Sequence, residues 1–425
     1  MKLGCSEIDI TPNIPVHMGG YGARKLPGNG VATNLFARGF VFAHGDVMTG
    51  LITADILMLN REQVEMIQAE ASRLTGIPEQ QIIVACSHTH SGPATFSRAG
   101  LGNPPDPEYI NWLLKALAGS LLMAKENLEP VRAGSATTSV QGIGANRRQA
   151  EATMDTQLTV VGFEDAAGNL KALLFNFPCH PTVLGADNLL VSAEYPGAAA
   201  SLIKKIYPRT TVGFINGACG DISTRFVRRG QNHAEVERLG MILGAHVVAL
   251  SAELEFADAD LAVTVQTLPA TLKPPVSKQD SEAELAQWKQ RLDELMAQGA
   301  TAAELRQAQT GMEGAMVQMQ RAQIQDQLET EAELVAWRLG GIGLVTVPGE
   351  LFSALGQRIE DNSPFRHNII AGYSNGYLGY IPDSIAYEQG GYETLSSPLA
   401  QGFGEKLADA AAAILTGLSK QEQEG

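Results

Sequence analysis

The sequence predicts an α/β fold in which a mixed β-sheet core is flanked by helices. Short apolar runs typical of buried strands, such as 81–86, alternate with longer segments of helical periodicity, such as 107–125. A length of 425 residues is enough for one large domain or two closely packed ones. Apolar residues make up 44% and charged residues 18% of the chain, which is the composition of a globular protein.

The first 260 residues contain two expected strand pairs, each joined by a turn with a central glycine. Further strands and helices alternate around these pairs, as an α/β fold requires. In chain order the expected elements are strands 36–43 and 50–58, a helix over 61–74, strand 81–86, a helix over 107–125, strands 156–163 and 170–177, strand 211–215 and a helix over 234–252.

A change of composition marks residues 278–332, where Gln, Glu, Ala, Leu and Met dominate. Apolar residues recur at helical spacing on both sides of Gly299, so we expect an inserted helical hairpin, with 1–277 and 333–425 forming the catalytic domain. Its methionine stripe favours helix-to-helix packing or a dimer seam, and a lid over the active site is the alternative. Strands at 333–337 and 343–347 and a helix over 403–417 complete the prediction.

Charge and cysteine content narrow the class of protein. The 31 basic and 46 acidic residues give a formal net charge of −15, which opposes binding to nucleic acid or anionic membranes and leaves small molecules or further copies of the chain as expected partners. The four cysteines have no CxxC spacing, so neither a disulfide framework nor a thiolate zinc cluster is expected. The N-terminus resembles no secretory leader and no run is long enough to span a membrane, so a cytoplasmic protein without a stable membrane anchor is expected.

Two histidines two residues apart, His88 and His90, follow an expected buried strand. Side chains at this spacing point to the same face of an extended segment, and the Ser-Gly-Pro sequence that follows presents them at a turn. His180 and Glu350 follow two further apolar runs. Two histidines and a carboxylate are common ligands of catalytic zinc, which keeps one position open for water. A pair of hydrogen-bonded structural histidines is the alternative interpretation of the first motif.

Seven short motifs in the same order over nearly the whole chain resemble the neutral, non-lysosomal ceramidases. Each motif alone is unspecific, but their order makes the resemblance specific. The motifs are Glu7–Pro12 with Met18–Tyr21, Ser87–Pro93, Asn146-Arg147, Phe175–Thr182, Gly220–Ser223, Pro348–Glu350, and Asn375–Tyr380 with Tyr392 twelve residues on.

The resemblance implies one Zn²⁺ per chain and assigns two groups of residues. Tyrosine is an unusual zinc ligand, and a loop tyrosine bound to backbone is the alternative for Tyr380. His90 would polarise the scissile carbonyl or protonate the leaving amine, Tyr392 would donate to the developing oxyanion, and Arg147 and Ser223 would bind polar parts of the substrate. The implied metal ligands are His88, His180, Glu350 and Tyr380. Ligand type alone also permits manganese or iron.

The expected function is that of a zinc metallohydrolase cleaving a linear amide, an N-acyl or N-substituted small molecule, through metal-activated water. Thr224-Arg225 stands where the family has Pro-Asn, and an acidic protein without an anchor has poor access to a membrane lipid, so a soluble amide is preferred to ceramide. The alternatives are a true ceramidase, a metal-dependent ester, lactone or glycoside hydrolase, and a non-catalytic binding protein. Asp55 either orients a ligand histidine or serves as a capping or turn aspartate. Cys219 is expected to be an inert buried cysteine, and a nucleophile with His180 as its base is the alternative.

Overall fold

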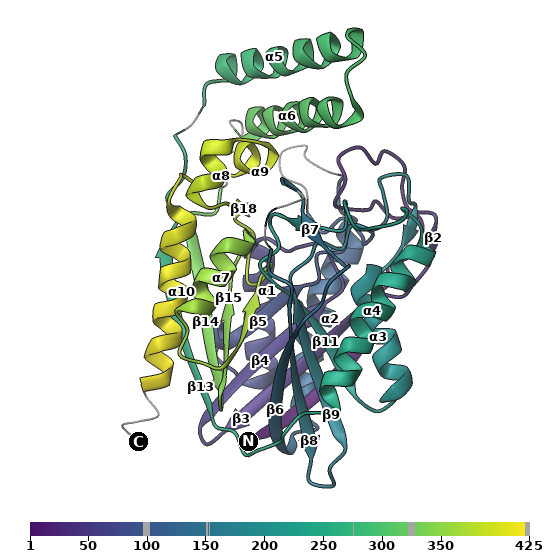
Figure 1. Cartoon of the computed structure of the whole chain (residues 1–425). Coiled ribbons are helices and arrows are strands. Elements are labelled where there is room, and N and C mark those ends of the chain that lie inside the picture. The colour runs from purple at the N-terminus through teal and green to yellow at the C-terminus, as the bar shows by residue number, and fades with distance from the viewer. Residues whose placement is uncertain (97–102, 150–151, 153, 275, 322–327, 421–425) are drawn as a thin grey trace.

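The computed structural model describes residues 1–96, 103–149, 152, 154–274, 276–321 and 328–420. Figure 1 shows two β-sheets packed face to face, with helices on the outer face of each. Three apolar cores separate the four layers: one between helices and the large sheet, one between the two sheets, and one between the small sheet and its helices. The predicted class, a mixed sheet core flanked by helices, is confirmed, and the core has two sheets.

The large sheet has eight strands in the order β11-β9-β8-β6-β1-β3-β4-β5. The outer pairs β11–β9 and β4–β5 are parallel, and the pairs between them are antiparallel. The strands are β1 (Lys2–Asp9), β3 (Phe36–His44), β4 (Val47–Ala54), β5 (Ile82–Cys86), β6 (Glu129–Ser139), β8 (Gln157–Asp165), β9 (Leu170–Phe177) and β11 (Thr211–Asn216).

Successive side chains of a strand point to opposite faces of the sheet, so the large sheet contributes side chains to two apolar cores. On β3, Phe40 and Phe42 face the second sheet, whereas Val41 between them faces the helices. The helical layer consists of α1 (Arg61–Thr75), α2 (Pro107–Lys125), α3 (Glu194–Ile206) and α4 (His233–Ser251). Helix α1 begins at a capping box, in which Asn60 and Gln63 satisfy each other's backbone N–H groups.

The small sheet has the order β13-β14-β15-β17, and β15–β17 is its parallel pair. Trp337 of β14 is fully buried between the sheets, with its ring centroid 5.5 Å from that of Phe42. The elements of this half are β13 (Leu261–Pro269), β14 (Glu331–Leu339), β15 (Ile342–Thr346), β17 (His367–Ala371), and the outer helices α7 (Ser353–Asp361) and α10 (Phe403–Lys420).

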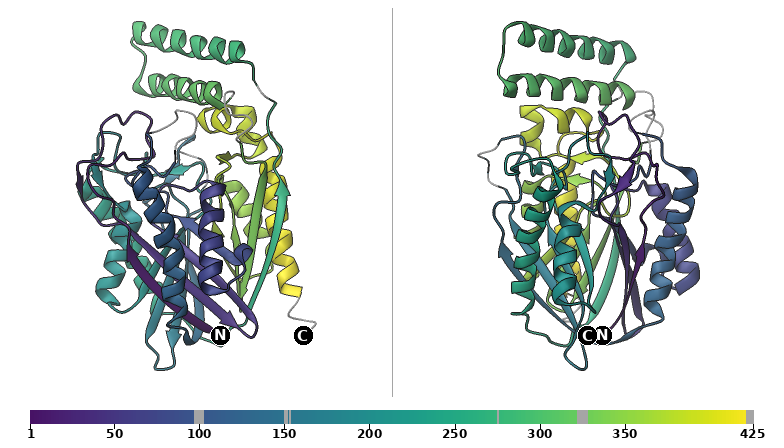
Figure 2. Two further views of the ribbon diagram at one scale, coloured as in Figure 1. Left: turned by 180° about the vertical axis from the view of Figure 1, so that it is seen from behind. Right: turned by 90° about the vertical axis from the view of Figure 1, so that its right-hand side faces the viewer.

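Beyond the sandwich, two helices lie stacked on the end of the molecule that carries α8 (Ser384–Gln389) and α9 (Tyr392–Ser396) (Figures 1 and 2). They are α5 (Lys278–Ala297) and α6 (Ala302–Arg321), called the arm below. Strand β14 begins at Glu331, so its first two residues fall within the segment 278–332 that was expected to form the hairpin. In the described part of the chain, no helix has the length and apolar character that crossing a bilayer requires.

Short two-stranded pairings connect the loops at the end of the molecule that carries α8 and α9. β2 (Gly30–Val31) pairs with β10 (Leu190–Val191), and β7 (Ala145–Asn146) pairs with β12 (Ile222–Ser223). β16 (Glu350–Leu351) runs parallel to β18 (Tyr380–Ile381). The residues singled out from the sequence lie on these pairings and in the loops beside them, so the small pairings fix their positions.

Candidate metal centre

Chain segments far apart in sequence meet where β5, β9 and β15 end. The loop after β5 carries His88 and His90, the segment after β9 carries His180, and Glu350 begins β16 a few residues after β15. The three histidines each offer a ring nitrogen, and these atoms all lie within 4.8 Å of one another. The fold therefore brings together the imidazoles that the sequence analysis identified.

The ring of His88 is fixed by its surroundings. Its Nδ1 lies 2.9 Å from the carbonyl oxygen of Leu57, and the ring of Tyr373 stacks on it with centroids 3.9 Å apart. Burial lowers the pKa of His88 to about 3, although Glu350 opposes that shift, so the ring is neutral at pH 7. Because Nδ1 donates its hydrogen to Leu57, Nε2 presents a lone pair to the site. The backbone of His88 has a φ of 66°, a strained conformation that is common at functional sites.

His180 is completely buried and is oriented in the same manner. Its Nδ1 lies 2.7 Å from the carbonyl oxygen of Cys219 and 2.9 Å from that of Ile222. Nδ1 must therefore carry a hydrogen, and Nε2 of a neutral ring presents a lone pair. That Nε2 lies 2.9 Å from Oε2 of Glu350, which also lies 3.7 Å from Nε2 of His88. Acceptors that face one another in a buried site fit a cation between them.

The carboxylate of Glu350 lies between two tyrosines that the sequence analysis did not assign. Tyr377 donates a hydrogen bond to Oε1, and the hydroxyl of Tyr373 lies 3.4 Å from Oε2. Burial by itself raises the pKa of Glu350, but His88, His180 and Arg147 outweigh it and lower that pKa to about 2. The side chain is therefore ionised at neutral pH and suits a divalent cation.

His90 lies beside this group with its Nε2 3.3 Å from Nε2 of His88. Its Nδ1 is buried and has no hydrogen-bond partner among the described residues. The loop of Gly20 and Tyr21 covers the ring: the Tyr21 ring is 5.0 Å away, and a Cβ on Gly20 would lie 2.6 Å from His90. Gly20 also has a φ of 92°, so close approach and backbone conformation both require glycine there. The position of His90 allows it to coordinate a metal or to move a proton next to one.

The remaining expected residues lie on one side of Glu350. Tyr380 is its direct strand partner, and the Tyr380 ring lies 5.7 Å from that of Tyr392 and 5.2 Å from the guanidinium carbon of Arg147. Arg147 donates to the carbonyl oxygen of Gly220 over 2.8 Å. The Tyr380 ring is thus held against a buried cation near the carboxylate, and the Tyr392 ring packs against Tyr380.

The carboxylate of Glu393 binds two successive arginines. Its Oε1 lies 2.8 Å from Nε of Arg147, and its Oε2 lies 2.9 Å from Nη1 of Arg148. Arg148 also donates to the carbonyl oxygen of Gly390, over 2.7 Å. This cluster fastens β7 to the start of α9. Glu393 was not predicted as a site residue, although it directly follows Tyr392 in the sequence.

Ser223, expected to bind a polar part of the substrate, is buried. Its Oγ accepts a hydrogen bond from the backbone N–H of Arg225 over 3.3 Å, and its backbone bridges to His180. Asp221, from the same motif, accepts hydrogen bonds from Asn146 and from the backbone and hydroxyl of Ser353. The motif therefore fastens three segments around the histidines.

The structure decides between the alternatives for two further residues: Asp55 is not a partner of a ligand histidine, and Cys219 is the inert buried cysteine that was expected. The carboxylate of Asp55 binds Arg38 and the backbone N–H of Phe36, so it orients no ligand histidine; backbone carbonyl groups do that. Cys219 is buried, and burial raises the pKa of its thiol well above the usual range despite a hydrogen bond with Tyr373. A thiol of that kind is no nucleophile at neutral pH.

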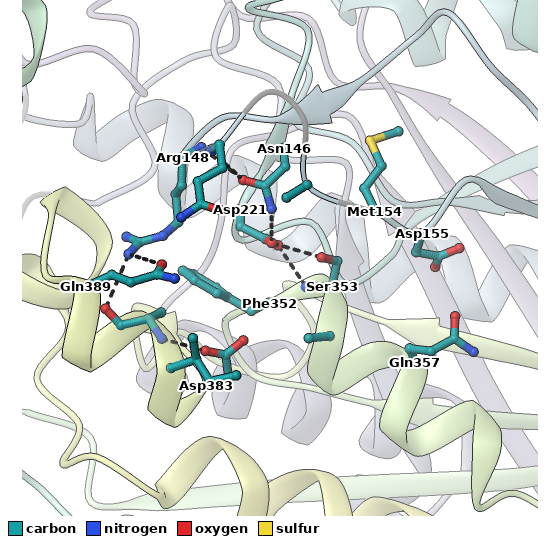
Figure 3. Close-up of a pocket in the computed structure, with 15 residues that line it drawn as sticks. Asn146, Arg148, Met154, Asp155, Asp221, Phe352, Ser353, Gln357, Asp383 and Gln389 are labelled. Atoms are coloured by element: carbon teal, nitrogen blue, oxygen red, sulfur yellow. Dashed lines mark hydrogen bonds between the residues drawn. The ribbon is translucent and has the colours of Figure 1, made fainter.

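A cavity of about 400 Å³ lies behind the Asn146–Asp221 pair (Figure 3). Arg148 and Gln389 line one side of it, and Asp155 lies on the opposite side. None of the candidate metal ligands lines this space. It is therefore distinct from the candidate metal centre among the described residues.

Comparison with known proteins agrees with this arrangement. Residues 1–227 match the family model of the N-terminal part of neutral/alkaline non-lysosomal ceramidases. A neutral ceramidase of Drosophila melanogaster is 27% identical over 253 residues, which cover 52% of this chain and 36% of that protein. The neutral ceramidase of Pseudomonas aeruginosa is 25% identical over 219 residues, 47% of this chain and 33% of that one. The chain spans about a third of the length of these curated relatives.

The fold has a solved counterpart. A crystal structure of the neutral ceramidase from Pseudomonas aeruginosa superposes with a TM-score of 0.77 at 19% identity, covering 99% of this chain and 74% of that one. A structure described as ceramidase complexed with C2 gives the same TM-score at 18% identity, covering 99% of this chain and 75% of that one. At this identity the likeness concerns the fold. The family model, which spans more than half of the sequence, carries the assignment: this chain belongs to the neutral/alkaline non-lysosomal ceramidase family.

Proposed function

We propose that this protein is a zinc-dependent amide hydrolase that acts on an N-acyl lipid amide of the ceramide type. Family membership supports cleavage of an amide bond, and the relatives that match are named neutral ceramidases. This weighs against the preference for a soluble amide that charge and motif differences suggested. The soluble amide remains a second candidate, because the net charge of −15 disfavours anionic membrane surfaces.

One observation carries the proposal: Nε2 of His180 and Nε2 of His88 lie 2.9 and 3.7 Å from the same oxygen of Glu350, in a site where all three side chains are buried. Nitrogen and carboxylate donors in this number are those of a catalytic zinc site. Tyr380, the strand partner of Glu350, is the expected fourth ligand. When bound, Zn²⁺ would lower the pKa of a water molecule towards 7 and polarise the amide carbonyl.

The proton steps are assigned to His90. Burial and the neighbouring rings His88 and His180 hold the pKa of His90 well below its usual range, so its ring is neutral and able to accept a proton. We assign to its Nε2, the nitrogen that faces His88, the proton released by the attacking water. The imidazolium so formed then protonates the amide nitrogen as it leaves, which returns His90 to its starting state.

The developing oxyanion is assigned to Tyr392. Burial raises the pKa of this tyrosine, so its hydroxyl keeps its hydrogen and can donate. Arg147, whose guanidinium carbon is 5.2 Å from the Tyr380 ring, adds a fixed positive charge beside the two tyrosines. Such preorganised groups stabilise negative charge more strongly in a buried site than in water.

The experiment is a substrate panel measured with zinc-loaded protein. We expect release of a long-chain amine base from a short-acyl ceramide in mixed detergent micelles, and none from the same protein carrying His180→Ala. A water-soluble N-acyl amino acid and a nitrophenyl ester complete the panel. Cleavage of the soluble amide without cleavage of ceramide would restore the soluble-amide candidate. Hydrolysis confined to the ester would refute amide hydrolysis as the activity.

A further inference from the structure

The arm lies directly on the short helix that carries Tyr392. Helix α6 covers α9 in Figures 1 and 2, and α5 lies on the outer side of α6. At the contact, a Cβ on Gly314 would lie 2.9 Å from Cβ of Leu395. Gly311, one turn earlier, faces the other way: its Cβ would lie 2.5 Å from the ring of Trp288 on α5. Two glycines thus let α6 approach α9 on one face and α5 on the other.

Helix α9 depends on its neighbours for its position. It has only five residues and no side-chain hydrogen bond at its N-cap, Gly391. A helix this short is not stable by itself, so tertiary contacts must fix it. On the inner side Glu393 holds Arg147 and Arg148. On the outer side the arm presses against Leu395.

The arm also contributes charge near the site. The carboxylate of Glu313, next to Gly314 on α6, is among the groups that raise the pKa of Tyr392. Glu313 is therefore close enough for its field to be felt at the tyrosine hydroxyl. A charge on the arm therefore acts on a tyrosine beside the candidate metal centre. An arm that served only dimerisation, far from the site, would have no such effect.

We propose that the arm is a positioning element of the active site, which holds the Tyr392 hydroxyl in place through the Gly314–Leu395 contact. This inference rests on the proposed function, in which Tyr392 donates to the oxyanion. Gly314 and Leu395 are then positioning residues. The arm is a fixed wall of the active site and not a lid that opens and closes. A displacement of about 1 Å in such a wall can reduce turnover on the order of 100-fold.

A matched pair of substitutions tests the contact. Gly314→Ala adds a Cβ against Leu395, whereas Gly311→Ala adds the same group to the same helix against Trp288. Both changes favour the helix, so neither unwinds α6. We expect kcat to fall roughly 10-fold or more in Gly314→Ala with a smaller change in KM, and to remain near the wild-type value in Gly311→Ala. Leu395→Ala, which makes room for the added methyl group, should restore kcat in Gly314→Ala.

Two further measurements separate this inference from the proposed function. In a Tyr392→Phe background Gly314→Ala should lower kcat no further, because its effect passes through that hydroxyl. Independently of turnover, 3-fluorotyrosine placed at position 392 should change its fluorine resonance in Gly314→Ala and return in the Leu395→Ala double variant. An unmoved resonance, or equal losses of kcat in both glycine variants, would overturn the inference. A wild-type protein that cleaves no amide while the resonance moves would refute the proposed function and leave the positioning role standing.

Discussion

The Nε2 atom of His180 lies 2.9 Å from Oε2 of Glu350, and the hydrogen of the His180 ring is already used on Nδ1 by backbone carbonyl groups. An imidazole lone pair and an ionised carboxylate repel each other in a buried site unless a proton or a cation lies between them. The same oxygen is 3.7 Å from Nε2 of His88, whose ring is tied down by its own Nδ1. The arrangement is therefore one that could hold a metal ion, as the proposed function requires.

Removal of one ligand should abolish metal binding. We expect close to one equivalent of zinc per chain in protein purified without added metal, and a sharp fall in His180→Ala and in Glu350→Gln, because three strong donors are needed. His246→Ala serves as the control, because this histidine lies on α4, where its Nδ1 donates to the carbonyl oxygen of Ile242 in the same helix. Elemental analysis measures the content. Retention of metal in both ligand variants would contradict the site.

Gly20→Ala should lower turnover without lowering metal binding. The new Cβ would lie 2.6 Å from the His90 ring at a φ of 92°, so the ring must shift. We expect kcat to fall on the order of 10- to 100-fold, with zinc content unchanged. Gly22→Ala, in the same loop but facing open space, is the control. Loss of zinc in Gly20→Ala would instead make His90 a ligand.

The sequence predicted which candidate ligand residues would come together, because these residues follow buried strands. An apolar run such as 82–86 identifies a strand, and the polar residues after it must lie at a sheet edge. Motif order supplied the rest, and the fold brings His88, His180 and Glu350 together. Metal coordination by these three residues and by Tyr380, the role of His90 and the identity of the metal stay predictions.

Other features depend on contacts between residues far apart in the chain, and short sequence motifs do not reveal such contacts. Asp55 was a candidate hydrogen-bond partner of a histidine, but its partner is Arg38 on the adjacent strand. The two residues are neighbours because of the register of β3 with β4, which the sequence does not reveal. Apolar runs show that a strand is buried without showing which sheet it joins, so the two-sheet core was not predicted. Tyr373 and Tyr377 were missed as partners of Glu350 for the same reason.

Glu393→Gln should destabilise the fold. Its carboxylate balances Arg147 and Arg148, whose side chains are 10% and 12% exposed, and the substitution leaves two buried charges without their partner. We expect the free energy of unfolding in urea to fall by about 3–5 kcal/mol. Asp409→Asn breaks the exposed ion pair with Arg358, and this substitution should change the free energy of unfolding little. Equal stability of the two variants would show that α9 is not held through this carboxylate.

The pH dependence of stability should reveal Glu360. Burial, followed by the neighbouring Asp155 and Asp361, raises the pKa of Glu360 from 4.5 to about 8, although Gln157 donates a hydrogen bond to it. Between those pH values the folded protein keeps a proton that the unfolded chain has released. Its contribution to stability is therefore complete below pH 4.5 and is lost as the pH rises towards 8.

Glu360→Gln removes this titration and retains an amide that can bind Gln157. Because the side chain is partly exposed, we expect a gain of about 1–3 kcal/mol at pH 9 and almost none at pH 4. Urea denaturation at a series of pH values measures the difference. Glu62→Gln, at an exposed position of α1, removes one negative charge as a control. A gain that is the same at every pH would come from packing or net charge, since only a proton bound to Glu360 in the folded state makes the gain grow with pH.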